Sequence, residues 1–196
     1  MKPLVSILIP CYNAGRWLNA TLESALAQTW PHTEIIVVND GSRDDSLAIA
    51  RSFEPRGVRV FDQPNGGQCA AFNRALREAR GDFFEYLDAD DLLAPDKLER
   101  QLTRLATLPA DSVASGAWAR FERDPAEAAF IPEPVWRDLD PVEWLITSWE
   151  GGGMMHGAAW LVPRAVAERA GGWNEELSLI NDFDYFARVL VAGRSR

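Results

Sequence analysis

The sequence lacks paired cysteines, an excess of positive charge and any long hydrophobic run. Its two cysteines, Cys11 and Cys69, lie among apolar or small residues without a Cys-x-x-Cys spacing, which predicts two reduced, buried thiols in a cytoplasmic protein. Lysine and arginine number 20 against 29 acids, a net charge of −9, whereas a nucleic-acid-binding surface needs clustered basic residues. No nucleic-acid partner is therefore expected, and a protein this acidic would need a metal ion to handle a phosphorylated substrate.

Two further absences limit the class of protein. No apolar run approaches the roughly 20 residues of a membrane-spanning helix, and residues 1–3 lead directly into a predicted strand instead of a signal peptide. No Gly-x-Gly-x-x-Gly motif follows the first predicted strand, which argues against an NAD-binding domain. The 196 residues, with 47% hydrophobic and 25% charged content, are typical of one soluble globular domain.

The first half of the chain alternates predicted strands with predicted helices. Apolar runs predict buried strands at Val5–Pro10, Glu34–Val38 and Val58–Phe61, and a fourth in the aromatic run that follows Gly81. This alternation indicates βαβ units, and therefore an α/β protein with a mostly parallel central sheet flanked by helices. The helices expected after the strands run from Leu18 to about Gln28, from Asp44 to about Phe53, from Gln68 to about Arg80, and over residues 95–107.

Polar, acidic or glycine-bearing residues follow all four of these strands. Ligands of open α/β sheets bind in the crevice at the carboxyl ends of the strands. Four consecutive strand ends with this character are better evidence for a ligand site than any one of them. The four segments are Pro10–Asn13, Asn39–Ser42, Asn65–Gly67 and Asp88–Asp91.

Three carboxylates fall within four residues after the fourth strand, at Asp88, Asp90 and Asp91. If the chain is still extended at Ala89, Asp88 and Asp90 point to the same side. Such a pair suits a hard divalent cation, Mg²⁺ or Mn²⁺, which takes carboxylate oxygens and leaves positions for substrate phosphates. The alternative is that Asp90 or Asp91 caps the helix of residues 95–107. These residues alone leave both interpretations open.

The second half is less regular. Ser112–Phe121 and Ala158–Val162 are predicted strands, residues 123–141 are proline-rich and predicted to be irregular, and Val142–Trp149 is predicted as a short helix. Two more helices are expected over Arg164–Ala170 and Asp182–Ala192, each stopped by glycine. The eight tryptophans suit a core, a sugar site or a membrane interface, and the sequence does not separate these roles.

Taken together, these segments resemble the inverting glycosyltransferases of family 2, which have the GT-A fold. The resemblance runs nearly end to end, and five segments in the family's order make it specific, whereas an isolated Asp-x-Asp is common in acidic turns. The matching segments are Ser6–Asn13, Val38–Asp44, Asn65–Gly67 with Ala71–Asn73, Leu87–Asp91, and Gly171–Leu177 with Asn181–Arg188.

The resemblance implies that the donor is a nucleotide-diphosphate sugar, in which the sugar is linked to UDP or GDP. Asp40 would accept hydrogen bonds from the base or ribose, with the alternative of an Asx turn onto Gly41 and Ser42. Asp88 would contact ribose or metal, and Asp90 would be the main ligand of Mg²⁺ or Mn²⁺. The other residues expected on the donor side are Pro10, Tyr12, Asn13, Asn65 and Gly67.

The resemblance also implies that Asp182 is the catalytic base. Inversion by single displacement needs a carboxylate on the acceptor side to take the proton of the attacking hydroxyl. The alternative is a cap for the last helix, a role that Asp184 would also suit. Among the tryptophans, Trp173 is the one expected near the sugars, because it lies in a matching segment. For His156, a hydrogen-bonding or exposed position is favoured over metal binding.

Three departures from the family's pattern bear on these assignments. Phe72 stands where the family often has arginine, so one donor contact is missing or comes from Arg74. Asn181 stands where an acid commonly precedes the base. The chain also ends soon after Gly193, where many relatives continue.

The sequence therefore predicts a single GT-A domain over residues 1–196. Residues 1–110 would form its nucleotide-sugar half, and residues 111–196 its acceptor half; whether that half is truncated at its C-terminus is left open by the sequence. The expected function is metal-dependent, inverting hexosyl transfer to a saccharide or lipid-linked acceptor in cell-envelope polysaccharide or glycolipid synthesis. The expected location is the cytoplasm, with peripheral contact at the inner face of the membrane. The alternative function is a non-catalytic nucleotide-sugar-binding module of the same fold.

Overall fold

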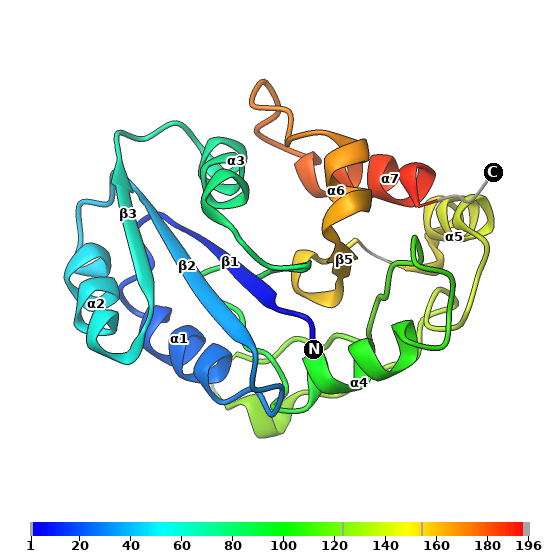
Figure 1. The fold of residues 1–196 in the computed structure, drawn as a ribbon, viewed down its shortest axis with the longest axis horizontal. Coiled ribbons are helices and arrows are strands. Elements are labelled where there is room, and N and C mark those ends of the chain that lie inside the picture. The colour runs from blue at the N-terminus through cyan, green and yellow to red at the C-terminus, as the bar shows by residue number, and fades with distance from the viewer. Residues whose placement is uncertain (1, 123, 154, 194–196) are drawn as a thin grey trace.

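A five-stranded sheet forms the centre of the computed structural model, which describes residues 2–122, 124–153 and 155–193 (Figure 1). The strand order is β3-β2-β1-β4-β5, with the first four strands parallel and β5 antiparallel to β4. The sheet thus joins the two halves of the chain, because β5 comes from the second half. The bounds are β1 Val5–Cys11, β2 Thr33–Asp40, β3 Arg59–Gln63, β4 Phe83–Tyr86 and β5 Leu161–Pro163.

Helices cover both faces of this sheet (Figure 1). Side chains alternate across a strand, so Ile7 and Ile35 pack with α1, α2 and α4, whereas Leu8 and Ile36 pack with α3, α6 and α7. Burial on both faces accounts for the continuous apolar strands of the sequence. The helices are α1 Leu18–Leu26, α2 Ser46–Ser52, α3 Gln68–Glu78, α4 Lys97–Leu105, α5 Pro141–Thr147, α6 Arg164–Ala170 and α7 Asn181–Ala192. The short turns are η1 Glu54–Arg56, η2 Pro125–Glu127, η3 Ser148–Gly152 and η4 Gly157–Ala159.

The structure confirms the α/β class and most predicted elements, with ends that differ by a few residues. The helix predicted over Arg164–Ala170 is α6, and it ends at Gly171, whose φ of 80° suits glycine. Within the described residues, the proline-rich excursion contains only η2 before α5 begins at Pro141. None of the described helices combines the length and apolar character that crossing a bilayer requires.

The strand predicted at Ser112–Phe121 is wrong. The segment makes one isolated bridge, in which Ala114 and Leu161 exchange backbone hydrogen bonds of 3.1 and 2.9 Å. The strand beside it, β5, is only three residues long and ends in Pro163, which has no N–H to donate. The segment therefore has no long strand edge with which to form further backbone hydrogen bonds. The other prediction in this region, Ala158–Val162, is partly right, because η4 occupies its first residues.

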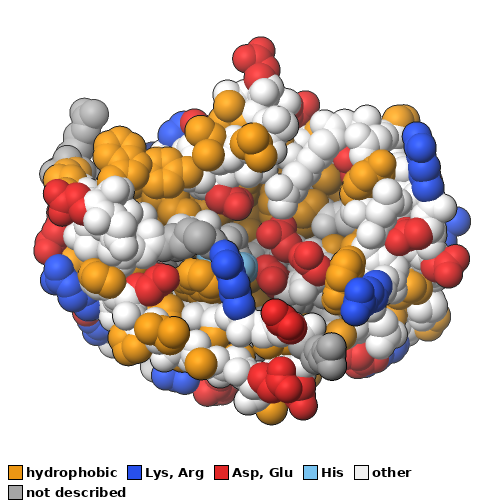
Figure 2. Space-filling view, turned by 180° about the vertical axis from the view of Figure 1, so that it is seen from behind, with side chains coloured by type: hydrophobic (Ala, Val, Ile, Leu, Met, Phe, Trp, Pro, Cys, Tyr) orange, Lys and Arg blue, Asp and Glu red, His pale blue; other side chains and the backbone are white. Residues whose placement is uncertain are grey.

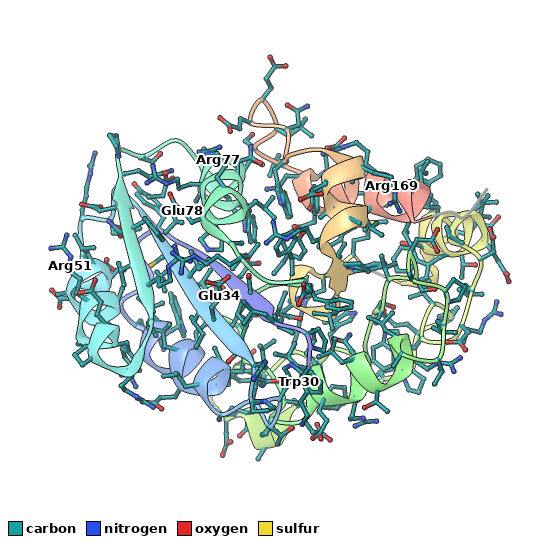
Figure 3. All side chains as sticks on the ribbon, viewed as in Figure 1. Trp30, Glu34, Arg51, Arg77, Glu78 and Arg169 are labelled. Atoms are coloured by element: carbon teal, nitrogen blue, oxygen red, sulfur yellow. The ribbon has the colours of Figure 1, made fainter. Side chains whose placement is uncertain are left out.

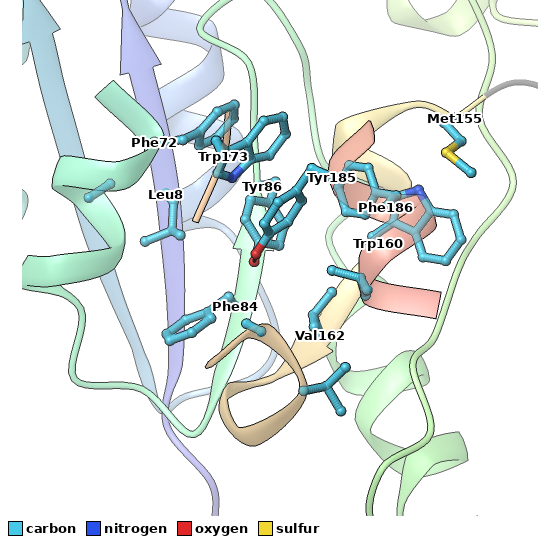
Figure 4. Close-up of a cluster of buried hydrophobic side chains, with 14 of the residues drawn as sticks. Leu8, Phe72, Phe84, Tyr86, Met155, Trp160, Val162, Trp173, Tyr185 and Phe186 are labelled. Carbon is cyan, nitrogen blue, oxygen red and sulfur yellow. Dashed lines mark hydrogen bonds between the residues drawn. The ribbon is translucent and has the colours of Figure 1, made fainter. Parts of the chain in front are cut away.

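Aromatic rings fill the core between the sheet and α3, α6 and α7 (Figure 4). Trp173 is 3% exposed and lies flat between Phe72, at 4.4 Å, and Tyr185, at 4.2 Å between ring centroids. The expectation that Trp173 contacts sugars is therefore wrong, because both of its faces are covered. Trp160 is likewise buried and stacks on Phe186.

Polar side chains tie the sheet together at its amino-terminal end. Glu34, labelled in Figure 3, accepts hydrogen bonds from the Ser6 hydroxyl at 2.6 Å and from the Arg59 guanidinium at 2.9 Å. The Ser6 hydroxyl in turn accepts one from the Gly81 N–H at 2.8 Å. These bonds lie at the opposite end of the strands from the segments predicted to bind a ligand.

Candidate functional site

A cleft of about 870 Å³ opens at the carboxyl ends of β1, β2 and β4. Its other wall comes from the second half of the chain, with Glu175, Leu177 and Asn181. On the face drawn in Figure 2, acidic side chains gather around a hollow near the middle, with a histidine beside them. The cleft brings together the predicted donor-side and metal residues, which are Pro10, Tyr12, Asn13, Asp40, Asn65, Gly67, Asp88 and Asp90.

The loops after β1 and β2 are fixed to each other by their own side chains. Asn13 has a φ of 51° and receives the Arg43 N–H on its side-chain oxygen at 2.8 Å, while its own N–H donates to the Ser42 hydroxyl at 3.0 Å. Asp44 accepts from the Gly15 N–H at 2.9 Å. These local bonds leave the ring of Tyr12 half exposed beside the cleft.

Asp40 ties the end of β2 to the loop after β3. Its side chain is almost fully buried, and its carboxylate accepts hydrogen bonds from the N–H groups of Gly66 and Gly67 at 2.9 and 2.8 Å and from the Gln63 amide at 2.8 Å. These partners replace the Asx turn onto Gly41 and Ser42. Asp40 thus shapes the cleft wall, and its contact with a nucleotide stays a prediction.

The acidic segment after β4 is a turn. The strand ends at Tyr86, and the Asp91 N–H closes the turn on the Asp88 carbonyl at 3.1 Å. The condition of an extended chain at Ala89 is therefore not met. The Ala89 carbonyl is anchored instead by the buried Thr21 hydroxyl at 2.9 Å.

The capping alternative for these acids is wrong. The residue at the amino-terminal boundary of α4 is Asp96, and no side chain caps that end. Asp88 and Asp90 line the cleft instead.

The carboxylates of this turn and of α7 lie close enough to influence one another. Burial, together with the charges of Asp182, Asp91 and Asp90, raises the pKa of Asp88 to about 7. Burial also raises the pKa of Asp182 to about 6, an effect that His156 opposes and Asp91 reinforces. Ionised acids in this arrangement repel one another, and a cation would relieve the repulsion.

The acids around Asp88 and Asp90 fit a hard divalent cation by charge and by donor type. Within the described part of the chain, however, no three histidine, cysteine or acidic side chains are already arranged as a set of metal ligands. What the chain offers is a partial, oxygen-only donor set in a strongly negative environment.

Gln68, which sequence reasoning missed, connects Asp88 to the start of α7. Its side-chain N–H donates to the Asp88 carboxylate at 2.7 Å, and its oxygen accepts from the Asn181 amide at 2.9 Å. An acid at position 181 could not donate that bond, which gives a physical reason for the departure from the family's pattern. The one hint in the sequence was that Gln68 directly follows Gly66 and Gly67 at the cleft.

His156 lies beside the acids, with its Nε2 atom 3.6 Å from the Asp91 carboxylate. Its ring stacks on Trp118 at 5.3 Å, and the Trp118 N–H donates to Glu133 at 3.2 Å. Because Glu133 belongs to the proline-rich segment of residues 123–141, that segment reaches the neighbourhood of the site. No motif indicated this position, because it depends on how the excursion folds back.

Asp182 lies in the first turn of α7, next to the acidic turn. The residue at the N-cap position of α7 is Ile180, so the alternative in which Asp182 is the N-cap is wrong. Asp184 pairs with Arg188 at 2.6 Å. Phe72, which stands where the family often has arginine, is buried in the aromatic core. Arg74, the residue considered as a substitute for that arginine, pairs with Glu78.

Residues 6–168 match the family model described as Glycosyl transferase family 2. An uncharacterized glycosyltransferase of Rickettsia felis is 33% identical over 194 residues, which cover 96% of this chain and 31% of that protein. The putative teichuronic acid biosynthesis glycosyltransferase TuaG of Bacillus subtilis is 41% identical over 104 residues, covering 52% of this chain and 41% of TuaG.

Solved structures show the same fold. TarS 1–349 of S. aureus, in complex with UDP-GlcNAc, matches with a TM-score of 0.80 and 20% identity over 96% of this chain and 54% of that one. The mannosyltransferase PcManGT of Pyrobaculum calidifontis, with GDP-Man and Mn²⁺, matches with a TM-score of 0.67 and 22% identity over 94% and 51%. The chain thus spans about a third of the Rickettsia felis relative and about half of these two chains. By its sequence match and its architecture, the chain belongs to glycosyl transferase family 2 and has the GT-A fold.

Proposed function

We propose that this chain transfers a sugar, with inversion and with a divalent metal, from a nucleotide-diphosphate sugar to an acceptor hydroxyl. The observation that carries the proposal is the convergence of the predicted donor-side residues on one cleft, whose acidic turn adjoins Asp182. A GT-A domain that only bound nucleotide sugars would need the donor wall, but would have no use for a carboxylate at the position of Asp182.

The donor would lie along the carboxyl ends of β1, β2 and β4. Asn13 and Asp40 hold the loops that form the wall, and the exposed ring of Tyr12 offers a face to the base. UDP and GDP sugars are the donors of choice, because TarS was solved with UDP-GlcNAc and PcManGT with GDP-Man.

Asp90 and Asp88 would hold Mg²⁺ or Mn²⁺ through carboxylate oxygens. The ion would supply charge neutralisation for the departing diphosphate. The chain itself keeps these acids together by anchoring the turn on Thr21 and by the bond from Gln68 to Asp88. PcManGT, a protein of the same fold, was solved with Mn²⁺.

Asp182 would take the proton of the attacking acceptor hydroxyl. With a pKa of about 6, it is ionised at neutral pH and basic enough to accept a proton in the transition state. The acceptor would approach from the side of residues 111–196. We expect a saccharide or lipid-linked acceptor of envelope polysaccharide synthesis; the relative TuaG is named for teichuronic acid biosynthesis.

The donor and metal assignments are tested by thermal stabilisation with UDP or GDP, with and without Mn²⁺. We expect stabilisation only when the metal is present, because a bound ligand stabilises by RT ln(1 + [L]/Kd). Asp90→Asn should weaken this effect by roughly 10–100-fold in ligand concentration, the usual cost of disturbing a metal site. Equal stabilisation without metal would refute the metal assignment.

The base is tested by replacing Asp182 with asparagine and following release of UDP or GDP from UDP-GlcNAc and GDP-mannose, with water or added saccharides as acceptor. Release should fall by about 10²–10⁴-fold, while binding of the nucleotide with Mn²⁺ is kept. Asp184→Asn is the matched control, since that acid pairs with Arg188. Release by Asp182→Asn near the unmodified rate would exclude it as the base. No release by the unmodified protein from any donor would favour the binding module.

A further inference from the structure

Two tyrosines connect the strand that carries the acidic turn to the helix that carries Asp182. Tyr86 is the last residue of β4 and precedes Asp88 by two positions, and Tyr185 follows Asp182 by three positions on α7. Their hydroxyl oxygens are 2.5 Å apart, and both side chains are fully buried (Figure 4). The bond thus connects, within the core, the strand that precedes the acidic turn and the helix that carries Asp182.

The hydroxyl bond adds something that the ring contacts do not. Tyr185 lies flat on Trp173, with a centroid distance of 4.2 Å and an interplanar angle of 10°. Tyr86 meets Tyr185 edge-on at 5.3 Å. Ring contacts resist separation but tolerate sliding, whereas a hydrogen bond is directional and weakens steeply when its angle changes. The hydroxyl pair therefore fixes how far α7 slides along the end of β4.

The face of α7 that this bond holds is the one that carries Asp182. Residues three apart on a helix are neighbours on its surface, so Asp182 lies one turn above Tyr185. Gly157 lies between the two segments, where an added Cβ would be 3.8 Å from the Tyr86 carbonyl and 3.9 Å from the Asp182 carboxylate. Both distances are ordinary van der Waals contacts, so the Asp182 carboxylate and the end of β4 border the same small space beside Gly157.

We propose that Tyr86 and Tyr185 are positioning residues, whose hydroxyl pair sets the place of Asp182 relative to the acidic turn. This inference rests on the proposed role of Asp182 as the base. Gln68 makes a second connection between Asp88 and α7, but it lies in the open cleft, where solvent and ligands compete for its bonds. The buried pair is the connection that persists when the cleft fills.

The two hydroxyls act as a neutral pair. Burial raises the pKa of Tyr185 to about 12, and burial together with Tyr185 raises the pKa of Tyr86 well above its usual range. Both hydroxyls therefore keep their protons at neutral pH. If one hydroxyl is removed, the other is left buried without its partner, so single and double replacements have different consequences.

The test compares Tyr86→Phe, Tyr185→Phe and the double variant with Ser6→Ala. Ser6 is a matched control, because its buried hydroxyl also joins distant segments but lies at the far end of the sheet. Each single variant and the control should lower the Tm by roughly 4–8 °C. The double variant should recover most of that loss, since no unpartnered hydroxyl remains.

If the hydroxyl pair positions Asp182, the double variant should recover stability without recovering activity. Nucleotide release should be roughly 10–100-fold slower in all three tyrosine variants, the double included, because a small misplacement of a reacting group is costly. Affinity for UDP with Mn²⁺ should stay within about twofold, and Ser6→Ala should keep its rate. A double variant that recovers both stability and rate would overturn the inference, as would equal rate losses in Ser6→Ala.

Hydrogen exchange supplies a readout that does not depend on turnover. In the double variant, the amides of Asp184 to Phe186 should exchange roughly tenfold faster, while those of β1 and β2 are unchanged, because the opening is local. Unchanged exchange in α7, or a uniform increase, would refute the positioning role. If the unmodified protein releases no nucleotide, the proposed function fails alone, and the exchange result still decides whether the pair holds α7.

Discussion

The donor wall of the cleft and the side that carries Asp182 are built by different means. On the donor wall, short polar side chains bond to backbone groups of neighbouring loops, as when Asp40 accepts from Gly66 and Gly67. On the other side, large rings from distant parts of the chain pack together, with Trp173 between Phe72 and Tyr185. One wall is held by directional bonds within motifs, and the other mainly by burial of aromatic area.

The two walls should therefore respond differently to substitution. A polar loop network depends on a few residue types at fixed spacing, so it changes little without losing its bonds. An aromatic core tolerates repacking as long as volume and pattern are kept. We therefore expect damage to the aromatic side to cost stability and transfer while sparing donor affinity, and damage to the polar wall to reduce donor affinity first.

The largest effect expected is that of Trp173→Ala. Removing a buried tryptophan from between two rings should lower the free energy of unfolding by about 3–5 kcal/mol, measured by denaturant titration. At a temperature where the variant is folded, affinity for UDP with Mn²⁺ should be nearly unchanged, while nucleotide release falls. Trp173→Phe, which keeps one ring in the stack, is the control and should lose much less stability. A variant that loses nucleotide affinity as strongly as stability would break the distinction between the two walls.

Replacing Asp40 with asparagine tests the polar wall. The asparagine side chain keeps one acceptor oxygen, but its NH₂ group would face N–H groups that donate to the Asp40 carboxylate. The free energy of unfolding should therefore fall by about 1–3 kcal/mol. The loop over Gly66 and Gly67 would loosen, and affinity for UDP should fall while the exchange protection of α7 is kept. Asp62→Asn is the control, since that exposed carboxylate accepts a hydrogen bond from Asn39 at 2.8 Å and is not among the residues that line the cleft. Unchanged nucleotide affinity would separate Asp40 from the donor wall.

The same difference explains what the sequence could predict. The strand ends of the first half were assigned correctly to one cleft, because parallel strands bring their carboxyl ends together whatever the packing details. Asp88 and Asp90 also reached the cleft, although through a turn instead of an extended strand. Their position after β4 was enough to predict that these acids lie at the cleft, because the sheet topology places the end of β4 there whether the chain is extended or turns.

The second half depends on contacts that no local pattern encodes. Ser112–Phe121 alternates like a strand but meets an edge that ends in Pro163, so tertiary context decides against the ladder. Trp173 lies in a segment that resembles the family but falls outside residues 6–168, which the family model matches, and its ring is covered on both faces. His156 follows a glycine-rich segment, yet its ring lies 3.6 Å from the Asp91 carboxylate and stacks on Trp118, which is distant in sequence. These outcomes depend on long-range packing, which is why sequence reasoning missed them.

The smallest effect expected is a shift in the pH profile, and it tests whether His156 acts electrostatically on Asp182. Because the pKa of Asp182 is raised to about 6, its protonated form is favoured by folding, and the base is lost as pH falls through that value. The kcat/KM for nucleotide release should therefore halve near pH 6 and fall about tenfold for each further unit.

His156 lowers the pKa of Asp182 by its charge, so His156→Gln should move this acidic limb to higher pH. Asp184→Asn, on the same helix but paired with Arg188, is the control and should leave the limb in place. If the limb does not move in His156→Gln, the histidine brought in beside the excursion does not act on the base.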